Sequence, residues 1–162
     1  MRVLFFFSRI SIFLLLMGCR TLPSLDQRSA STALIDTDST ALGRAITPLS
    51  GVHQGKSGIY SLRKARQAFA ARILLAQAAE RSLDIQYYIW HQDTTGILLF
   101  ESIRAAADRG VRVRLLLDDN NTSGMDPILK ALDAHTHIEI RLFNPFLLRE
   151  PRWIGYITDF HA

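Results

Sequence analysis

The stretch Arg109-Gly110-Val111-Arg112-Val113-Arg114-Leu115-Leu116-Leu117-Asp118-Asp119 decides the fold class of this chain. Its second residue, Gly110, is a glycine of the kind that ends helices, and an apolar run with interleaved arginines follows. Two carboxylates and the turn-forming residues 120–124 close the run. The stretch therefore predicts the end of a helix, a strand over 111–117 and a loop, in that order.

Similar units lie on either side of this stretch. Alternation over residues 83–89 predicts one more strand, with a helix before it and another from about Thr95 to Arg109. Asp126 and Pro127 predict a further helix, with Asp126 as its cap and Pro127 at its first position, and a third strand starts near Ile138. Strand starts near 83, 111 and 138 are 28 and 27 residues apart. This spacing predicts an α/β fold with a parallel sheet, right-handed connections and helices on both faces.

Ligands of parallel sheets collect where the strands end at their carboxyl edge. His91, Asp118 and Asn144 follow or end the three predicted strands, so they are candidates for a pocket rim. Plainer interpretations stay open: Asp118 accepts loop amide hydrogen bonds, Asp119 is solvated and His91 is a hydrogen-bonded loop residue. With one cysteine and no histidines at ligand spacing, we expect neither a metal nor a cofactor.

Residues 1–18 are typical of a signal peptide. Arg2 and Arg9 precede an apolar core over 10–17 that only Ser11 interrupts, and Arg9 leaves this run too short to span a bilayer. The next motif, Leu16-Met17-Gly18-Cys19, resembles the lipobox of bacterial lipoproteins, in which the cysteine carries the lipid anchor. The alternative is an ordinary signal peptide with a chance cysteine.

The resemblance to lipoproteins implies a protein of the cell envelope that faces the periplasm from a membrane, with the outer membrane favoured because Arg20, and not an aspartate, follows Cys19. Residues 19–58 are polar with scattered apolar positions, and we expect a tether. From Cys19 onward 17 basic and 15 acidic side chains remain. This balance is too small to predict nucleic-acid binding, although it permits contact with anionic headgroups.

Several strings together resemble the phospholipase D superfamily, and more closely its bacterial cardiolipin synthase-like branch. They are Ser57-Gly58-Ile59-Tyr60-Ser61-Leu62, residues 82–90 with Asp93-Thr94-Thr95-Gly96, residues 109–122, and Arg141-Leu142-Phe143-Asn144-Pro145-Phe146. The resemblance covers about residues 57 to 160. It implies phosphodiester chemistry on membrane phospholipids without a metal.

The resemblance also implies two His-x-Lys-x-x-x-x-Asp motifs, in which one histidine attacks phosphorus and the other protonates the leaving oxygen. None of the five histidines here has a lysine two residues on, so no catalytic residue is assigned. We therefore expect residues 59–162 to be an incomplete, N-terminal part of such a domain, inactive alone, whose partner is the missing C-terminal part of the same fold. Two alternatives are a non-enzymatic envelope lipoprotein with an α/β binding module, and an unrelated phosphate-binding α/β domain.

Overall fold

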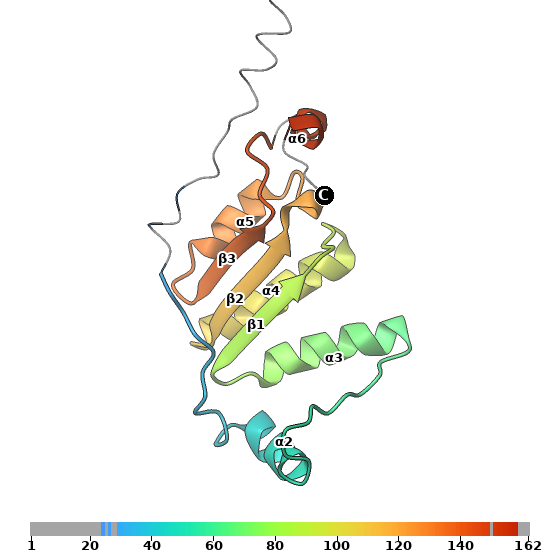
Figure 1. Cartoon of the computed structure of the whole chain (residues 1–162), viewed down its shortest axis with the longest axis vertical. Coiled ribbons are helices and arrows are strands. Elements are labelled where there is room, and N and C mark those ends of the chain that lie inside the picture. The colour runs from blue at the N-terminus through green and yellow to red at the C-terminus, as the bar shows by residue number, and fades with distance from the viewer. Residues whose placement is uncertain (1–23, 25, 27–28, 150, 159–162) are drawn as a thin grey trace, which may run out of the picture. The chain divides into compact units, whose positions relative to one another are not determined.

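The computed structural model describes residues 24, 26, 29–149 and 151–158 (Figure 1). Residues Ser31–Asn144 form one compact unit, and the described residues on either side of this range belong to a second. The predicted signal peptide and Cys19 lie outside the described residues. Among the helices of the described part, none is long and apolar enough to span a bilayer.

The unit Ser31–Asn144 contains a three-stranded sheet. Its elements, in chain order, are α2 (Ala41–Gly51), α3 (Ala65–Ala78), β1 (Ser82–Tyr87), α4 (Thr94–Asp108), β2 (Arg112–Asp118), the 3-10 turn η1 (Asp119–Asn121), α5 (Asp126–Asp133) and β3 (Ile138–Phe143). All strand pairs are parallel, in the order β1-β2-β3. The predicted α/β fold and parallel sheet are thus confirmed. Helix α2 falls inside the segment 19–58, where no helix was predicted.

Strand β2 follows directly from the end of α4, as the sequence predicts. Gly110 has a φ of +88°, a left-handed conformation that glycine adopts without steric cost. Its N–H donates to the carbonyl of Ala107 (2.8 Å), and the N–H of Val111 donates to the carbonyl of Ala106 (3.2 Å). These two bonds make a Schellman motif, and Val111 packs on Ala106 beside it.

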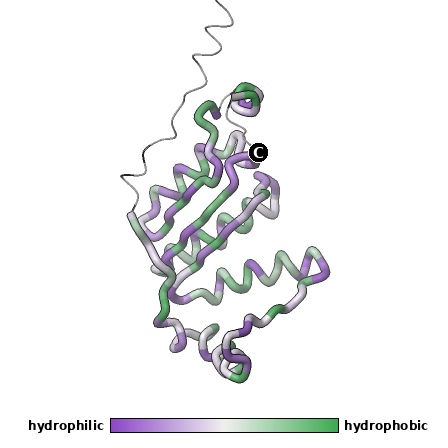
Figure 2. The backbone as a smooth tube through the Cα atoms, in the orientation of Figure 1, coloured by the Kyte–Doolittle hydropathy of each residue, from purple (hydrophilic) through white to green (hydrophobic). Residues whose placement is uncertain are grey.

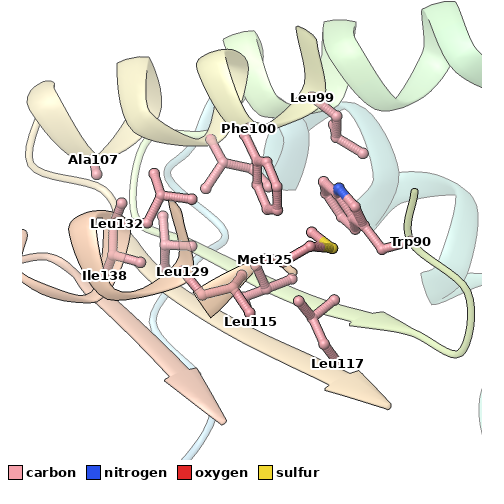
Figure 3. Close-up of a cluster of buried hydrophobic side chains, with 12 residues drawn as sticks. Trp90, Leu99, Phe100, Ala107, Leu115, Leu117, Met125, Leu129, Leu132 and Ile138 are labelled. Carbon is pink, nitrogen blue, oxygen red and sulfur yellow. The ribbon is translucent and has the colours of Figure 1, made fainter. Parts of the chain in front are cut away.

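Apolar side chains of the three strands and of α4 and α5 form the core. The register aligns Ile85, Leu115 and Ile140 in one row across the sheet. Residues of α4 and α5 cover this face, and Ile103 and Leu115 have exposed fractions of 0% and 1%. Figure 3 shows the packed side chains, with α4 above the sheet.

The opposite face of the sheet is polar. Asp84, Arg114 and Glu139 share one row across β1, β2 and β3, and Figure 2 shows hydrophilic and hydrophobic positions alternating along the strands. Within the described part of Ser31–Asn144, we find helices packed on the apolar face alone. The predicted second helix layer is therefore not seen among these residues, where Arg112 and Arg141 add further charges to the face.

The start of α5 also differs from the prediction. Met125 is the N-cap, so Asp126 and Pro127 are the first two residues of the helix. Asp126 as the cap is therefore wrong by one residue. Its carboxylate still lies in the first turn, where a negative charge stabilises the helix dipole.

The described residues after Asn144 contain α6 (Arg152–Thr158). Phe146 is buried and meets the ring of Tyr156 edge-on, with 5.4 Å between ring centroids. The guanidinium of Arg152 lies 4.6 Å from the centroid of Phe146. A cation over an aromatic face in this range is attracted by the ring quadrupole.

Candidate functional site

After the end of β1, the chain places the side chain of Trp90 in the hydrophobic core. The indole is 4% exposed, stacks on Phe100 with 4.4 Å between centroids, and meets Tyr87 edge-on at 4.9 Å. Figure 3 shows Trp90 beside Leu99 and Phe100. Trp90 therefore fills the core, and the next residue, His91, returns to the surface and is exposed.

Helix α4 begins next to His91 with a well-formed cap. The Asp93 carboxylate accepts from the Gly96 N–H (2.9 Å) and from the Thr95 hydroxyl (2.7 Å). These bonds, the Gly96 amide first, hold the pKa of Asp93 below its ordinary value. A Cβ at Gly96 would lie 1.9 Å from the carbonyl oxygen of His91. This position therefore requires glycine, because the first turn of α4 lies directly against the backbone of His91.

The two carboxylates that end β2 have different surroundings. Asp118 accepts a hydrogen bond from the backbone N–H of Asn120 (2.9 Å), as the plainer interpretation predicts. Asp119 is 0% exposed, and its carboxylate accepts from the Thr122 hydroxyl (2.5 Å). The prediction of a solvated Asp119 is therefore wrong. The loop folds back over this side chain, so that a polar residue is buried with a hydrogen-bonded partner.

The third candidate, Asn144, follows β3 and is exposed. Its φ of +48° is in the left-handed region, which asparagine tolerates better than most residues. A contact that the sequence did not suggest joins the neighbouring loops: the side-chain amide of Asn121 donates to the carbonyl of Tyr88 (3.0 Å). This bond links the loop after β1 to the loop after β2.

The parallel register places His91, Asp118 and Asn144 after neighbouring strands at one edge of the sheet. Within the described residues, no hydrogen bond joins any two of these side chains. The same part of the chain contains no group of three or more His, Cys, Asp or Glu side chains placed to hold a metal ion. The three residues remain predicted rim positions. Their side chains can donate and accept hydrogen bonds, but within the described residues they do not form a catalytic group.

A second polar region, which was not predicted from the sequence, lies on the charged face of the sheet. A shallow cavity of about 280 Å³ is lined by strand residues and by Ser31, among them Asp84, Gln86, Arg114, Glu139 and Arg141. Its centre is a bidentate ion pair in which Arg114 Nε and Nη2 each lie 2.6 Å from an Asp84 oxygen. This pairing lowers the pKa of Asp84 and raises that of Arg114. The signal was present as charged residues at alternate strand positions.

No protein-family model matches the chain. It is 59% identical over 119 residues to cardiolipin synthase C of Escherichia coli (strain K12), a match that covers 74% of this chain and 25% of that protein. It is also 28% identical over 145 residues to an uncharacterized protein of Helicobacter pylori (strain ATCC 700392 / 26695), covering 88% of this chain and 29% of that one. The matches thus span less than a third of either relative.

One solved structure, of the archaeal chromatin protein TrmBL2 with its novel mode of DNA binding, aligns with 65% of this chain and 42% of its own length. The TM-score is 0.40 and the identity is 21%, and a likeness at this level carries no argument. The identity to the E. coli protein, in contrast, confirms the resemblance drawn from the sequence. The chain is a partial relative of the cardiolipin synthase-like branch of the phospholipase D superfamily.

Proposed function

We propose that this chain is part of a phosphatidyltransferase or phosphodiesterase of the phospholipase D type, cardiolipin synthase-like, that acts on membrane phospholipid. The observation that carries the proposal is the 59% identity to E. coli cardiolipin synthase C. The resemblance was drawn from three predicted strands and the residues that follow them. The structure contains these strands as β1, β2 and β3. His91, Asp118 and Asn144 are the proposed rim of the substrate pocket.

The proposed location is the cell envelope, with a lipid on Cys19 that holds the protein to a membrane and the body facing the periplasm. The basic start, the apolar core and the lipobox-like tetrapeptide support this proposal. The outer membrane is favoured because Arg20 follows the cysteine. Labelling cells with radioactive palmitate tests the anchor: the parent chain should incorporate label and the Cys19→Ser variant should not.

The 162 residues supply no histidine with a lysine two positions on. We therefore propose that they contribute part of the α/β scaffold, and that the attacking and proton-donating imidazoles belong to the remaining part of the same fold. On this proposal the chain alone transfers no phosphatidyl group. The proposed partners are membrane phospholipid and that remaining part.

A segment exchange tests the function. In E. coli cardiolipin synthase C, the 119 matched residues are replaced by their counterparts from this chain, and cardiolipin formation from phosphatidylglycerol vesicles is followed by mass spectrometry. We expect the exchanged protein to make cardiolipin, whereas the full 162-residue chain assayed beside it does not. A folded exchanged protein without activity would contradict the proposed family function. Cardiolipin made by the 162-residue chain would contradict its proposed inactivity.

A further inference from the structure

The loop after β1 is held by a side chain from the neighbouring loop. Strand β1 ends at Tyr87, and the next residues, Tyr88 and Ile89, are 66% and 49% exposed. Trp90 then enters the hydrophobic core (Figure 3). The carbonyl of Tyr88 lies in the short exposed part, and it accepts a hydrogen bond from the side-chain amide of Asn121 (3.0 Å). A backbone group that water could satisfy thus has a partner in the protein.

The loop after β2 gives this bond a firm support. Asp119 and Thr122 are both 0% exposed, and the Thr122 hydroxyl donates to the Asp119 carboxylate (2.5 Å). The backbone N–H of Thr122 donates to the carbonyl of Asp119 (3.2 Å), and the N–H of Met125 donates to the carbonyl of Thr122 (3.0 Å). Met125 is 2% exposed and joins the same core as Trp90. Asn121 therefore extends from a loop whose inner side is buried and hydrogen-bonded.

We propose that Asn121 is a positioning residue of the substrate pocket, whose bond to Tyr88 holds the loop after β1 against the loop after β2. His91 follows Tyr88 by three residues, and Asp118 precedes Asn121 by three residues. The bond therefore fixes two proposed rim positions relative to each other. The inference rests on the proposed function, because it takes the rim to be part of a phospholipid site.

The bond acts on the binding of the headgroup and not on the attack at phosphorus. A phospholipid headgroup presents a phosphodiester anion and hydroxyl groups, so several hydrogen-bonding side chains have to meet it together. A loop that is free to move must be ordered when the ligand binds, and the lost entropy lowers the affinity. The attacking and proton-donating imidazoles are proposed to lie outside this chain. Loss of the bond should therefore change KM more than kcat.

The position of Asn121 requires a hydrogen-bond donor. A backbone carbonyl only accepts hydrogen bonds, and the carboxamide of asparagine supplies N–H donors. Asn121→Asp keeps the shape of the side chain but sets a carboxylate oxygen against the carbonyl, whereas Asn121→Gln keeps the donor on a side chain one methylene longer. Gln92→Glu is the matched control, because it makes the same change from amide to carboxylate at an exposed residue of the loop after β1. Within the described residues, the Gln92 side chain has no hydrogen bond.

Kinetics of the exchanged E. coli cardiolipin synthase C test the proposal, with residues 82–144 of this chain inside the exchanged segment. Loss of one hydrogen bond shifts an equilibrium about two- to tenfold, so Asn121→Asp should raise KM for phosphatidylglycerol by about that factor and leave kcat within about twofold of the parent. Asn121→Gln should lie closer to the parent, and Gln92→Glu should leave both constants within about twofold. A loss of folded enzyme alone would lower the maximal rate at an unchanged KM. An unchanged KM in Asn121→Asp, or an equal rise in Gln92→Glu, overturns the proposal.

A spin label tests the role of Asn121 without catalysis. Gln92→Cys in the full chain, combined with Cys19→Ser, carries one nitroxide in the loop after β1, and its electron paramagnetic resonance spectrum reports the mobility of that loop. We expect Asn121→Asp to narrow the spectrum and Asn121→Gln to leave it close to that of the parent. An exchanged protein without activity contradicts the proposed function alone. A spectrum that Asn121→Asp does not change contradicts the role of Asn121, even where the exchanged protein is active.

Discussion

Arg109 is expected to join two helices of the apolar layer, and its replacement by alanine tests this. It is the C-cap of α4, and its Nη2 donates to carbonyls of α3 and its end: Ala76 (2.9 Å), Gln77 (3.0 Å) and Ala79 (3.3 Å). Its Nη1 donates to Ala105 of its own helix (3.0 Å). The last carbonyls of a helix have no partner within that helix, so one guanidinium satisfies acceptors that otherwise need water.

The size of the effect follows from these bonds. Hydrogen bonds to charged groups contribute about 1.5–3 kcal/mol each when well shielded. Here Arg109 is exposed and one nitrogen is shared among three acceptors, so we expect Arg109→Ala to lower the free energy of unfolding by about 1–2 kcal/mol in all. Arg109→Lys keeps the positive charge at the helix end but not the fork of donors, and should lose about half as much.

Arg104 provides the control on the same helix. Its guanidinium pairs with Asp108 at 2.7 Å and with Glu101 at 3.8 Å, and its side chain is 52% exposed. Exposed pairs of this kind contribute about 0.3–0.5 kcal/mol. Urea unfolding of the full chain, followed by circular dichroism, measures both variants. Equal losses for Arg109→Ala and Arg104→Ala would refute the role of Arg109 as a link between helices.

Three further stability changes can be measured in the same way. Gly110→Ala should cost about 1 kcal/mol through its left-handed φ alone, since no atom lies within 4 Å of the added Cβ, while Gly58→Ala stays within about 0.5 kcal/mol. Ile103→Ala empties a fully buried position and should cost about 3–4 kcal/mol. The Arg114 guanidinium lowers the pKa of Asp84 in the folded state. The ion pair therefore stabilises the fold above the unfolded-state pKa of about 3.9, and this stabilisation is lost as the pH falls through the folded-state pKa. Asp84→Asn removes it at every pH. The two proteins should therefore differ at pH 6 and converge as the pH falls below the lowered pKa of Asp84. A difference that grows on acidification would contradict this sign.

The sheet could be predicted because its information is local. Val113, Leu115 and Leu117 alternate with polar residues, and Gly110 marks the preceding helix end, so a short window contains the strand, its inner face and its start. Helix α2 was missed although it has a local signal: the Thr40 hydroxyl caps it by accepting from the Gly43 N–H (2.9 Å), and Leu42, Ile46 and Leu49 recur at helical spacing. Its first N–H donates to the Glu80 carboxylate (2.7 Å), 39 residues further along the chain. The contact with Glu80 adds a long-range cap that the sequence of the segment does not reveal.

The candidate site shows the same division. The strand order implied that His91, Asp118 and Asn144 follow neighbouring strands, and the register agrees. The burial of Asp119 depends on how the loop after β2 folds back to Thr122, and composition alone cannot give that path. The bond from Asn121 to Tyr88 likewise joins two loops that are far apart in sequence. Side-chain environment at strand ends is decided by loop conformation, which the alternation of the strands does not encode.

The contacts of the predicted tether change the reach of the proposed lipid anchor. Arg114 donates to the Ser31 carbonyl and hydroxyl (3.2 and 3.0 Å), and Arg81 pairs with Asp36 at 2.8 Å. With these bonds formed, the 12 residues from Cys19 to Ser31 span at most about 40 Å, much less than a free segment ending at residue 58. Exposed contacts such as the one between Arg81 and Asp36 contribute about 0–1 kcal/mol and weaken with salt. The distance that an anchored body can move from the membrane is therefore set by a few weak polar bonds, and not by the length of the polar segment alone.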